Sequence, residues 1–234
     1  MSLCLFDSTP GELVGLESEF VLSGRIDNQL STWAAFAALT DDCDLLSSGS
    51  EISVAAAFNH EEVGSSSATG ADSQTVSHWI EKILKSVGTG DVPSVMARSL
   101  LVSADCAHGL HPNYASKHQA DHKVYVQQGI VFKGNVNQRY STTCVTAAMA
   151  REVCRLGKIP VQDFLVRNDS PCGSTIGPML SATLGVRSID IGATQWAMHS
   201  CRESCGVEDV INIKQACAAF FKYWRKVDDA HEEV

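Results

Sequence analysis

The stretch GIVFKGNVNQRYSTTCVTAAMAREVCRLGKIPVQDFLVR, residues 129–167, contains a short apolar run, a helical pattern and a second apolar run. Residues 129–133 are typical of a short strand, and residues 141–156 of a helix that starts at Ser and Thr and is followed by Gly157. Residues 159–167 indicate another strand, whose proline favours an edge strand or the first strand position. This strand–helix–strand order predicts an α/β fold.

The same alternation continues through the rest of the chain. We expect strands at 52–58, 99–104 and 186–192, helices at 73–87 and 207–226, and a further apolar helix opened by Asp27. The first residues, MSLCLFDSTPGE, indicate a strand followed by a turn, and the polar tail from Val227 is expected to fray. The prediction is one α/β domain over residues 1–234, with a mainly parallel central sheet flanked by helices and a frayed tail at 227–234.

Composition argues against several classes of function. The 234 residues carry a formal net charge of −9, which disfavours a broad nucleic-acid interface or an anionic membrane surface. The sequence contains no run of about 18 apolar residues, so we expect no membrane-spanning helix. The nine cysteines form no CxxC pair and no regular framework, which favours free thiols and a cytoplasmic protein.

In the stretch AAAFNHEEVGSSSATGAD, residues 55–72, an apolar run is followed closely by two adjacent carboxylates, Glu61 and Glu62. Like charges at the end of a buried strand repel each other and are partly desolvated. A cation would compensate for both effects. One glutamate could bind a metal ion while its neighbour stays unligated and accepts a proton from water.

The other candidate ligands are Asp105 and His199, which follow predicted strands, and Asp27, which opens a predicted helix. Each also has an ordinary explanation. Asp27 could cap the helix that follows it, and Asp105 could satisfy loop amides. His199 could be a histidine with ordinary partners, and the three-residue spacing of His108 and His111 fixes no geometry. Considered together, carboxylates and an imidazole that meet at one edge of a sheet suit zinc or a similar divalent ion.

These residues lie in segments that resemble aspartyl aminopeptidases, a family of dinuclear zinc exopeptidases. The matching segments, in chain order, are SGRIDNQLS, AAFNHEEVGSSSATGA, SADCAHGLHPNY, VFKGNVNQRYSTT, NDSPCGSTIGP and IDIGATQWAMHSCRE. The resemblance runs from about residue 4 to about residue 226. It implies a zinc-exopeptidase-like fold, two divalent ions that are zinc by preference, with manganese or cobalt as alternatives, and removal of N-terminal Asp or Glu from peptides.

The resemblance also implies a role for each site residue. Asp27 matches the acid that bridges the two metals, Glu61 the general base and Glu62 the ligand beside it. Asp105 and His199 match ligands of the second metal. Lys133 falls where the family places a basic residue near the acidic side chain of the substrate. The remaining expected substrate-binding residues are His108 and, in the CGSTIGP loop at 172–178, Gly173, Ser174 and Thr175.

The sequence departs from the family at its N-terminus, where family members are considerably longer. We therefore expect an N-terminally truncated catalytic domain without the dimerisation domain and without the first metal's histidine. His60 and His108 are candidate replacements, although strand geometry would point His60 away from the side of Glu61. The alternatives are a catalytically impaired member that acts as a structural or regulatory subunit, and a related zinc deacylase or carboxypeptidase. A homo-oligomer is expected when the protein is full length.

Overall fold

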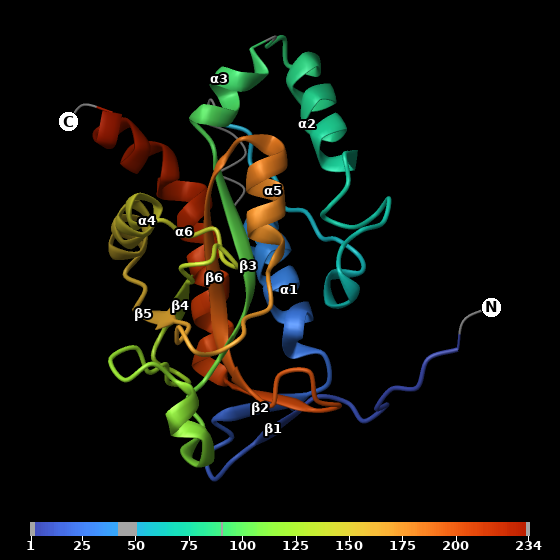
Figure 1. Cartoon of the computed structure of the whole chain (residues 1–234), viewed down its shortest axis with the longest axis vertical. Coiled ribbons are helices and arrows are strands. Elements are labelled where there is room, and N and C mark those ends of the chain that lie inside the picture. The colour runs from blue at the N-terminus through green and yellow to red at the C-terminus, as the bar shows by residue number, and fades with distance from the viewer. Residues whose placement is uncertain (1–2, 42–50, 90, 233–234) are drawn as a thin grey trace.

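The computed structural model describes residues 3–41, 51–89 and 91–232. Figure 1 shows a twisted sheet with helices packed along it. The strands of the described residues are β1 (Glu12–Val14), β2 (Phe20–Ser23), β3 (Leu100–His108), β4 (Ile130–Gly134), β5 (Val161–Leu165), β6 (Arg187–Trp196) and β7 (Glu203–Gly206). The helices are α1 (Ile26–Asp41), α2 (Thr75–Ser86), α3 (Val92–Ala97), α4 (Cys144–Gly157), α5 (Ile176–Leu184) and α6 (Val207–Glu232), together with short 3-10 helices at Glu61–Val63 and Pro112–Lys117.

The described strands form one mixed sheet. Its order is β1-β2-β7-β6-β4-β5, and β3 pairs with β6. The two longest pairings, β3 with β6 and β4 with β5, are parallel, whereas the shorter pairings are antiparallel. The predicted α/β class with a sheet flanked by helices is confirmed. The sequence analysis predicted a mainly parallel sheet and did not predict strands β1, β2 and β7 or the antiparallel pairing of β4 with β6.

The strand–helix–strand unit that predicts the fold is present as β4, α4 and β5. Thr143 caps α4, because its hydroxyl accepts the amide of Thr146 while the Thr146 hydroxyl accepts the amide of Thr143. The chain leaves α4 through Lys158 in the left-handed region. Pro160 then precedes β5, which is the last strand of the sheet order, as expected for a strand that begins at a proline.

The main core lies between one face of the sheet and the helices α1, α4 and α6. Alternate residues of β3 separate the two faces. Leu100 and Val102 pack against this core, whereas Leu101 packs against a smaller cluster on the opposite face that contains Val76 of α2 and Leu180 of α5. Figure 1 shows α6 running along β6 while α5 lies across the other side of the sheet. The sheet is thus covered on both faces at its centre.

Two predicted strands are absent. Residues 52–58 form no strand and make no ladder pairing within the described part of the chain, and Ile52 and Val54 are exposed. A strand needs a neighbouring backbone, and the apolar composition of this run cannot supply one. Residues 3–11 are likewise without regular structure, Leu5 and Phe6 are exposed, and the first strand begins at Glu12. Residues 1–2 lie outside the described residues.

The prediction of a frayed tail is wrong for residues 227–232. Helix α6 continues to Glu232, Val227 is 7% exposed and Asp228 is fully buried. Asp228 forms ion pairs with Arg187 at 2.6 Å and with Arg225 at 2.5 Å. The two arginines neutralise the buried charge of Asp228, and the polar sequence of the tail gives no sign of these partners. Residues 233–234 lie outside the described part.

The expectations about membrane-spanning helices and cysteines can be compared with the described residues. Within the described ranges, no helix is both long and apolar enough to cross a membrane. The eight described cysteines are free thiols. The localisation of the protein stays a prediction.

Candidate metal centre

The pairing of β2 with β7 brings together two loops that are distant in sequence. The strands are antiparallel, and Ser23, the last residue of β2, is opposite Glu203, the first residue of β7. Asp27 follows β2 by a few residues, and His199 precedes β7. The two side chains therefore start from adjacent backbone segments, so they meet although the two residues are 172 positions apart in the sequence.

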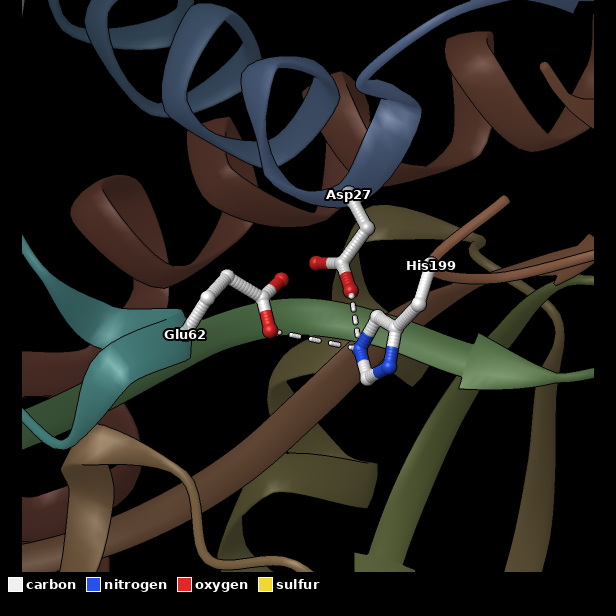
Figure 2. A group of neighbouring side chains, drawn as sticks. All are labelled: Asp27, Glu62 and His199. Carbon is white, nitrogen blue, oxygen red and sulfur yellow. Dashed lines mark ion pairs between the residues drawn. The ribbon is translucent and has the colours of Figure 1, made fainter. Parts of the chain in front are cut away.

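Asp27, Glu62 and His199 form a compact cluster of potential metal ligands. Nε2 of His199 lies 3.3 Å from Oδ2 of Asp27 and 3.4 Å from Oε2 of Glu62. One ligand atom from each residue lies within 4.8 Å of the others. Figure 2 shows the three side chains converging from the start of α1, the 3-10 helix at Glu61–Val63 and the loop before β7. Three of the predicted metal ligands are therefore brought together.

The entry into α1 explains how Asp27 can point into this cluster. Asp27 and Asn28 have non-helical backbone angles, and the peptide bond between them is cis. Asn28 rather than Asp27 accepts the amide of Ser31, at 3.3 Å, and it also donates to the carbonyl of Ala104 at 2.8 Å. The capping explanation for Asp27 is thus wrong, because Asn28 makes the capping hydrogen bond and leaves the Asp27 carboxylate to the cluster.

The carboxyl of Asp27 is strongly perturbed. Burial raises its pKa to about 9, and the neighbouring charges of Asp105, Glu62 and Glu203 act in the same direction. A carboxyl so surrounded by other acids holds a proton at neutral pH unless a cation takes its place. This is the electrostatic condition that a bound divalent ion would satisfy.

Glu61 and Glu62 do not leave a strand but lie in the 3-10 helix. His60 precedes them and Gly64 follows them, both with left-handed backbone angles. The His60 ring is bonded to Oγ of Ser67 at 2.7 Å, so His60 is engaged in its own loop. Although Glu61 is exposed as a residue, partial burial of its carboxyl, followed by the charges of Asp105 and Glu62, raises its pKa.

Asp105 lies within β3, beside Asp27 but with a different main partner. Nζ of Lys133 is 2.8 Å from Oδ2 of Asp105 and donates to the carbonyl of Cys106 at 2.9 Å. Burial disfavours ionisation of Asp105, but the charge and hydrogen bond of Lys133, together with hydrogen bonds from Asp27 and the Cys106 amide, outweigh this effect and lower its pKa. The resemblance assigns His199 and Asp105 to the same metal, whereas the ion pairs of His199 are with Asp27 and Glu62.

Lys133 is 2% exposed, so its ammonium is not a free cation in an open pocket. Two of its contacts are the Asp105 carboxylate and the Cys106 carbonyl, and it lies 4.8 Å from the centre of the Tyr140 ring. His108 is the last residue of β3 and is exposed overall. Partial burial of its ring and the nearby Lys133 charge lower the pKa of His108.

The predicted substrate loop lies just before α5, as expected. Gly173 and Ser174 are exposed, and Thr175 is buried. Thr175 donates to Oδ1 of Asp190 at 2.5 Å, while Ser174 donates to the carbonyl of Arg139 at 3.3 Å. The Thr175 bond ties the loop to β6, and the Ser174 bond ties it to Arg139. Arg139 precedes Tyr140, whose ring lies against Lys133. The roles of these residues in substrate binding stay predictions.

The cluster fits a zinc ion by its donor chemistry. Zinc is bound by carboxylate oxygen and imidazole nitrogen, and Asp27, Glu62 and His199 offer two such oxygens and one nitrogen within 4.8 Å. The raised pKa of Asp27 indicates an excess of negative charge at this point. The residues that are present therefore suit a divalent cation, and the number of ions stays a prediction.

Sequence reasoning missed Glu203, which lies beside two of the predicted ligands. Its side chain is 2% exposed and accepts the amides of Asp27 at 2.8 Å and His199 at 2.7 Å. Its place in HSCRE, four residues after His199, is the signal that was available. That signal could not identify the amide of Asp27 as its second partner, because the pairing of β2 with β7 was not predicted.

The fold and this cluster define an α/β protein with a candidate zinc centre at the ends of its strands. Residues 1–221 match the family model described as aminopeptidase I zinc metalloprotease (M18). The chain belongs to this family.

Individual relatives agree with this assignment. The chain is 42% identical over 227 residues to a probable aspartyl aminopeptidase of Ricinus communis, covering 95% of this chain and 46% of the relative. It is 45% identical to a probable M18 family aminopeptidase 2 of Ectopseudomonas mendocina, covering 94% and 49%. The chain spans about half the length of the curated relatives it matches.

Solved structures show the same fold. The cryo-EM structure of the Ape4 and Nbr1 complex matches with a TM-score of 0.88 and 38% identity, covering 96% of this chain and 43% of that chain. The structure of the S. cerevisiae mApe1 dodecamer matches with a TM-score of 0.85 and 30% identity, covering 98% and 52%.

Proposed function

We propose that this chain is the metal-binding catalytic part of an aminopeptidase that removes N-terminal Asp or Glu from peptides. The observation that carries the proposal is the convergence of Asp27, Glu62 and His199, with Glu61 adjacent, in a chain of the M18 family. The acidic specificity is supported by relatives named aspartyl aminopeptidase.

In this proposal each acid has a separate task. Asp27, Glu62, Asp105 and His199 would hold two divalent ions, and zinc would supply Lewis-acid polarisation of the scissile carbonyl and a more acidic water. Glu61 accepts the proton of the attacking water and then donates it to the leaving amine. Burial and the charges of Asp105 and Glu62 raise its pKa in the direction of the operating pH, which favours a base that also returns its proton.

Recognition of the acidic side chain is assigned to Lys133, with a constraint from its surroundings. Two of the contacts of its ammonium are Asp105 and the Cys106 carbonyl. A substrate carboxylate would therefore use the remaining donor of the ammonium, whose nitrogen lies 4.8 Å from the centre of the Tyr140 ring. His108, Gly173, Ser174 and Thr175 would line the rest of the substrate site.

A second candidate function is a catalytically impaired member that acts as a structural or regulatory subunit. Assembly into a homo-oligomer belongs to either proposal and is supported by the dodecamer formed by the mApe1 relative. A cytoplasmic location stays a prediction.

The deciding experiment measures zinc per chain and hydrolysis on one sample. Bound zinc with faster cleavage of an aspartyl amide than of leucyl or lysyl amides supports the acidic aminopeptidase. Bound zinc without cleavage supports the impaired subunit. The assay is repeated after adding, as a second polypeptide, the segment of a relative that this chain does not cover. Cleavage only in its presence supports a catalytic part that requires this segment for activity. Absence of zinc binding under both conditions would contradict the metal-dependent proposal.

A further inference from the structure

We propose that Glu203 is a positioning residue that sets the spacing between Asp27 and His199 for metal binding. The inference rests on the proposed function, since it concerns the same candidate centre. It adds a residue that is not itself a candidate ligand and that acts through the backbone of two ligands.

The contacts of Glu203 are specific to the two ligand-bearing residues. Oε2 accepts the amide of Asp27 at 2.8 Å, and Oε1 accepts the amide of His199 at 2.7 Å. Because the two oxygens belong to one rigid carboxylate, they fix the separation of the two amides. The side chains that start from these backbone positions then meet with Nε2 of His199 3.3 Å from Oδ2 of Asp27.

The burial of Glu203 is costly unless its charge is satisfied. The residue is 2% exposed, and among the described residues no cationic side chain lies in ion-pair range of it. A buried carboxylate requires hydrogen bonds in compensation. Both of its amide partners lie in the candidate centre, so its desolvation is offset only if the two loops hold their places.

The loop before β7 has a particular need for such a contact. Ala197 and His199 both have positive φ angles, 56° and 66°, which non-glycine residues adopt at some cost. The His199 side chain is 62% exposed and so is little constrained by packing. The hydrogen bond from the His199 amide to Glu203 therefore does much to hold this ligand in position.

The test is zinc affinity, measured by competition with a chelator, in the full 234-residue chain and in Glu203→Gln. The amide side chain keeps the size but offers one acceptor for two backbone donors. We expect affinity to fall by about 10- to 100-fold, the usual effect of losing an outer partner of a metal ligand. The absorption spectrum of the cobalt-loaded protein should change as well, because the ligand geometry changes.

Asp209→Asn is the matched control. Asp209 is also a buried acid that accepts backbone amides, from Gln127 and Gly206, but it lies outside the candidate centre. We expect it to leave zinc affinity and the cobalt spectrum unchanged even where it lowers the melting temperature. Equal zinc affinity of Glu203→Gln and the unmodified chain would overturn this inference and leave the proposed function standing. Failure of the unmodified chain to bind zinc would overturn the proposed function itself.

A measurement on the unmodified chain keeps the inference testable if Glu203→Gln does not fold. The amide protons of Asp27 and His199 should exchange slowly with solvent, as read by nuclear magnetic resonance, because a buried carboxylate accepts both. Rapid exchange at either amide would overturn the inference.

Discussion

The ammonium of Lys133 in β4 lies 2.8 Å from Oδ2 of Asp105 in β3, across the intervening strand β6, and both groups are largely shielded from solvent. The pair keeps Asp105 ionised, since Lys133 lowers its pKa against the effect of burial. An ionised Asp105 is the form that would bind a metal ion in the proposed centre. We therefore expect Lys133 to affect the candidate centre before any substrate is present.

Replacing Lys133 by methionine should weaken zinc binding by about tenfold or more, the lower end of the range for loss of an outer partner. Without the ammonium, burial favours the protonated form of Asp105. Zinc affinity measured at pH 7 by chelator competition checks this. Lys214→Met is the control, because Lys214 pairs with the exposed Asp41, which is not a member of the cluster. Unchanged zinc affinity together with a loss confined to acidic substrates would instead assign Lys133 to selectivity alone.

The two adjacent glutamates should separate binding from turnover. Glu61→Gln should retain zinc and lose hydrolysis by about 10²- to 10⁴-fold, because an amide cannot accept the proton of water. Glu62→Gln should lose zinc, since Glu62 is the member of the pair that contacts His199. Zinc content and aspartyl-amide hydrolysis are measured on both variants. Turnover of Glu61→Gln equal to that of the unmodified chain would remove Glu61 as the base.

The long elements could be predicted from local pattern because their periodicity reports burial directly. The β4–α4–β5 unit and helix α2 are examples. The run at 52–58 failed because apolar character specifies burial but not the neighbouring strand that a ladder requires. The short strands β2 and β7 carry too few residues for a period to be visible.

The candidate ligands could be predicted as residue types, but their supporting contacts could not. Glu203 and Asp27 are 176 positions apart, and their bond depends on a strand pairing with no local signal. Lys133 was expected to be available to substrate, yet its position in β4 faces Asp105 in β3. Contacts of this kind follow from the topology of the sheet, which one sequence does not specify.

Asp209 should make stability depend on pH. Burial raises its pKa to about 7, against the amides of Gln127 and Gly206, which lower it. Between the unfolded value near 3.8 and about 7, the folded state holds a proton that the unfolded state has lost. Stability from this group is therefore fully present below the unfolded pKa and is lost as pH rises toward 7, at about 1.4 kcal/mol per pH unit at most.

Comparison with Asp209→Asn isolates this contribution, because asparagine does not titrate. The melting temperature of the unmodified chain, relative to the variant, should be higher at pH 5 than at pH 8. Parallel melting profiles of the two proteins across this range would show that Asp209 is ionised in the folded state throughout.

Asp228 and Asp229 should differ sharply although they are neighbours in the last turns of α6. Asp228 is fully buried between Arg187 and Arg225. Removing one member of a buried pair leaves the other uncompensated and costs about 3–5 kcal/mol. Asp229 is 53% exposed, and its pairs with Arg98 and Arg225 lie at the surface, so its loss should cost less than about 1 kcal/mol.

Urea unfolding of Asp228→Asn and Asp229→Asn measures both free energies of unfolding. Small and equal losses would mean that the helix end contributes little to stability, as the polar sequence alone suggests.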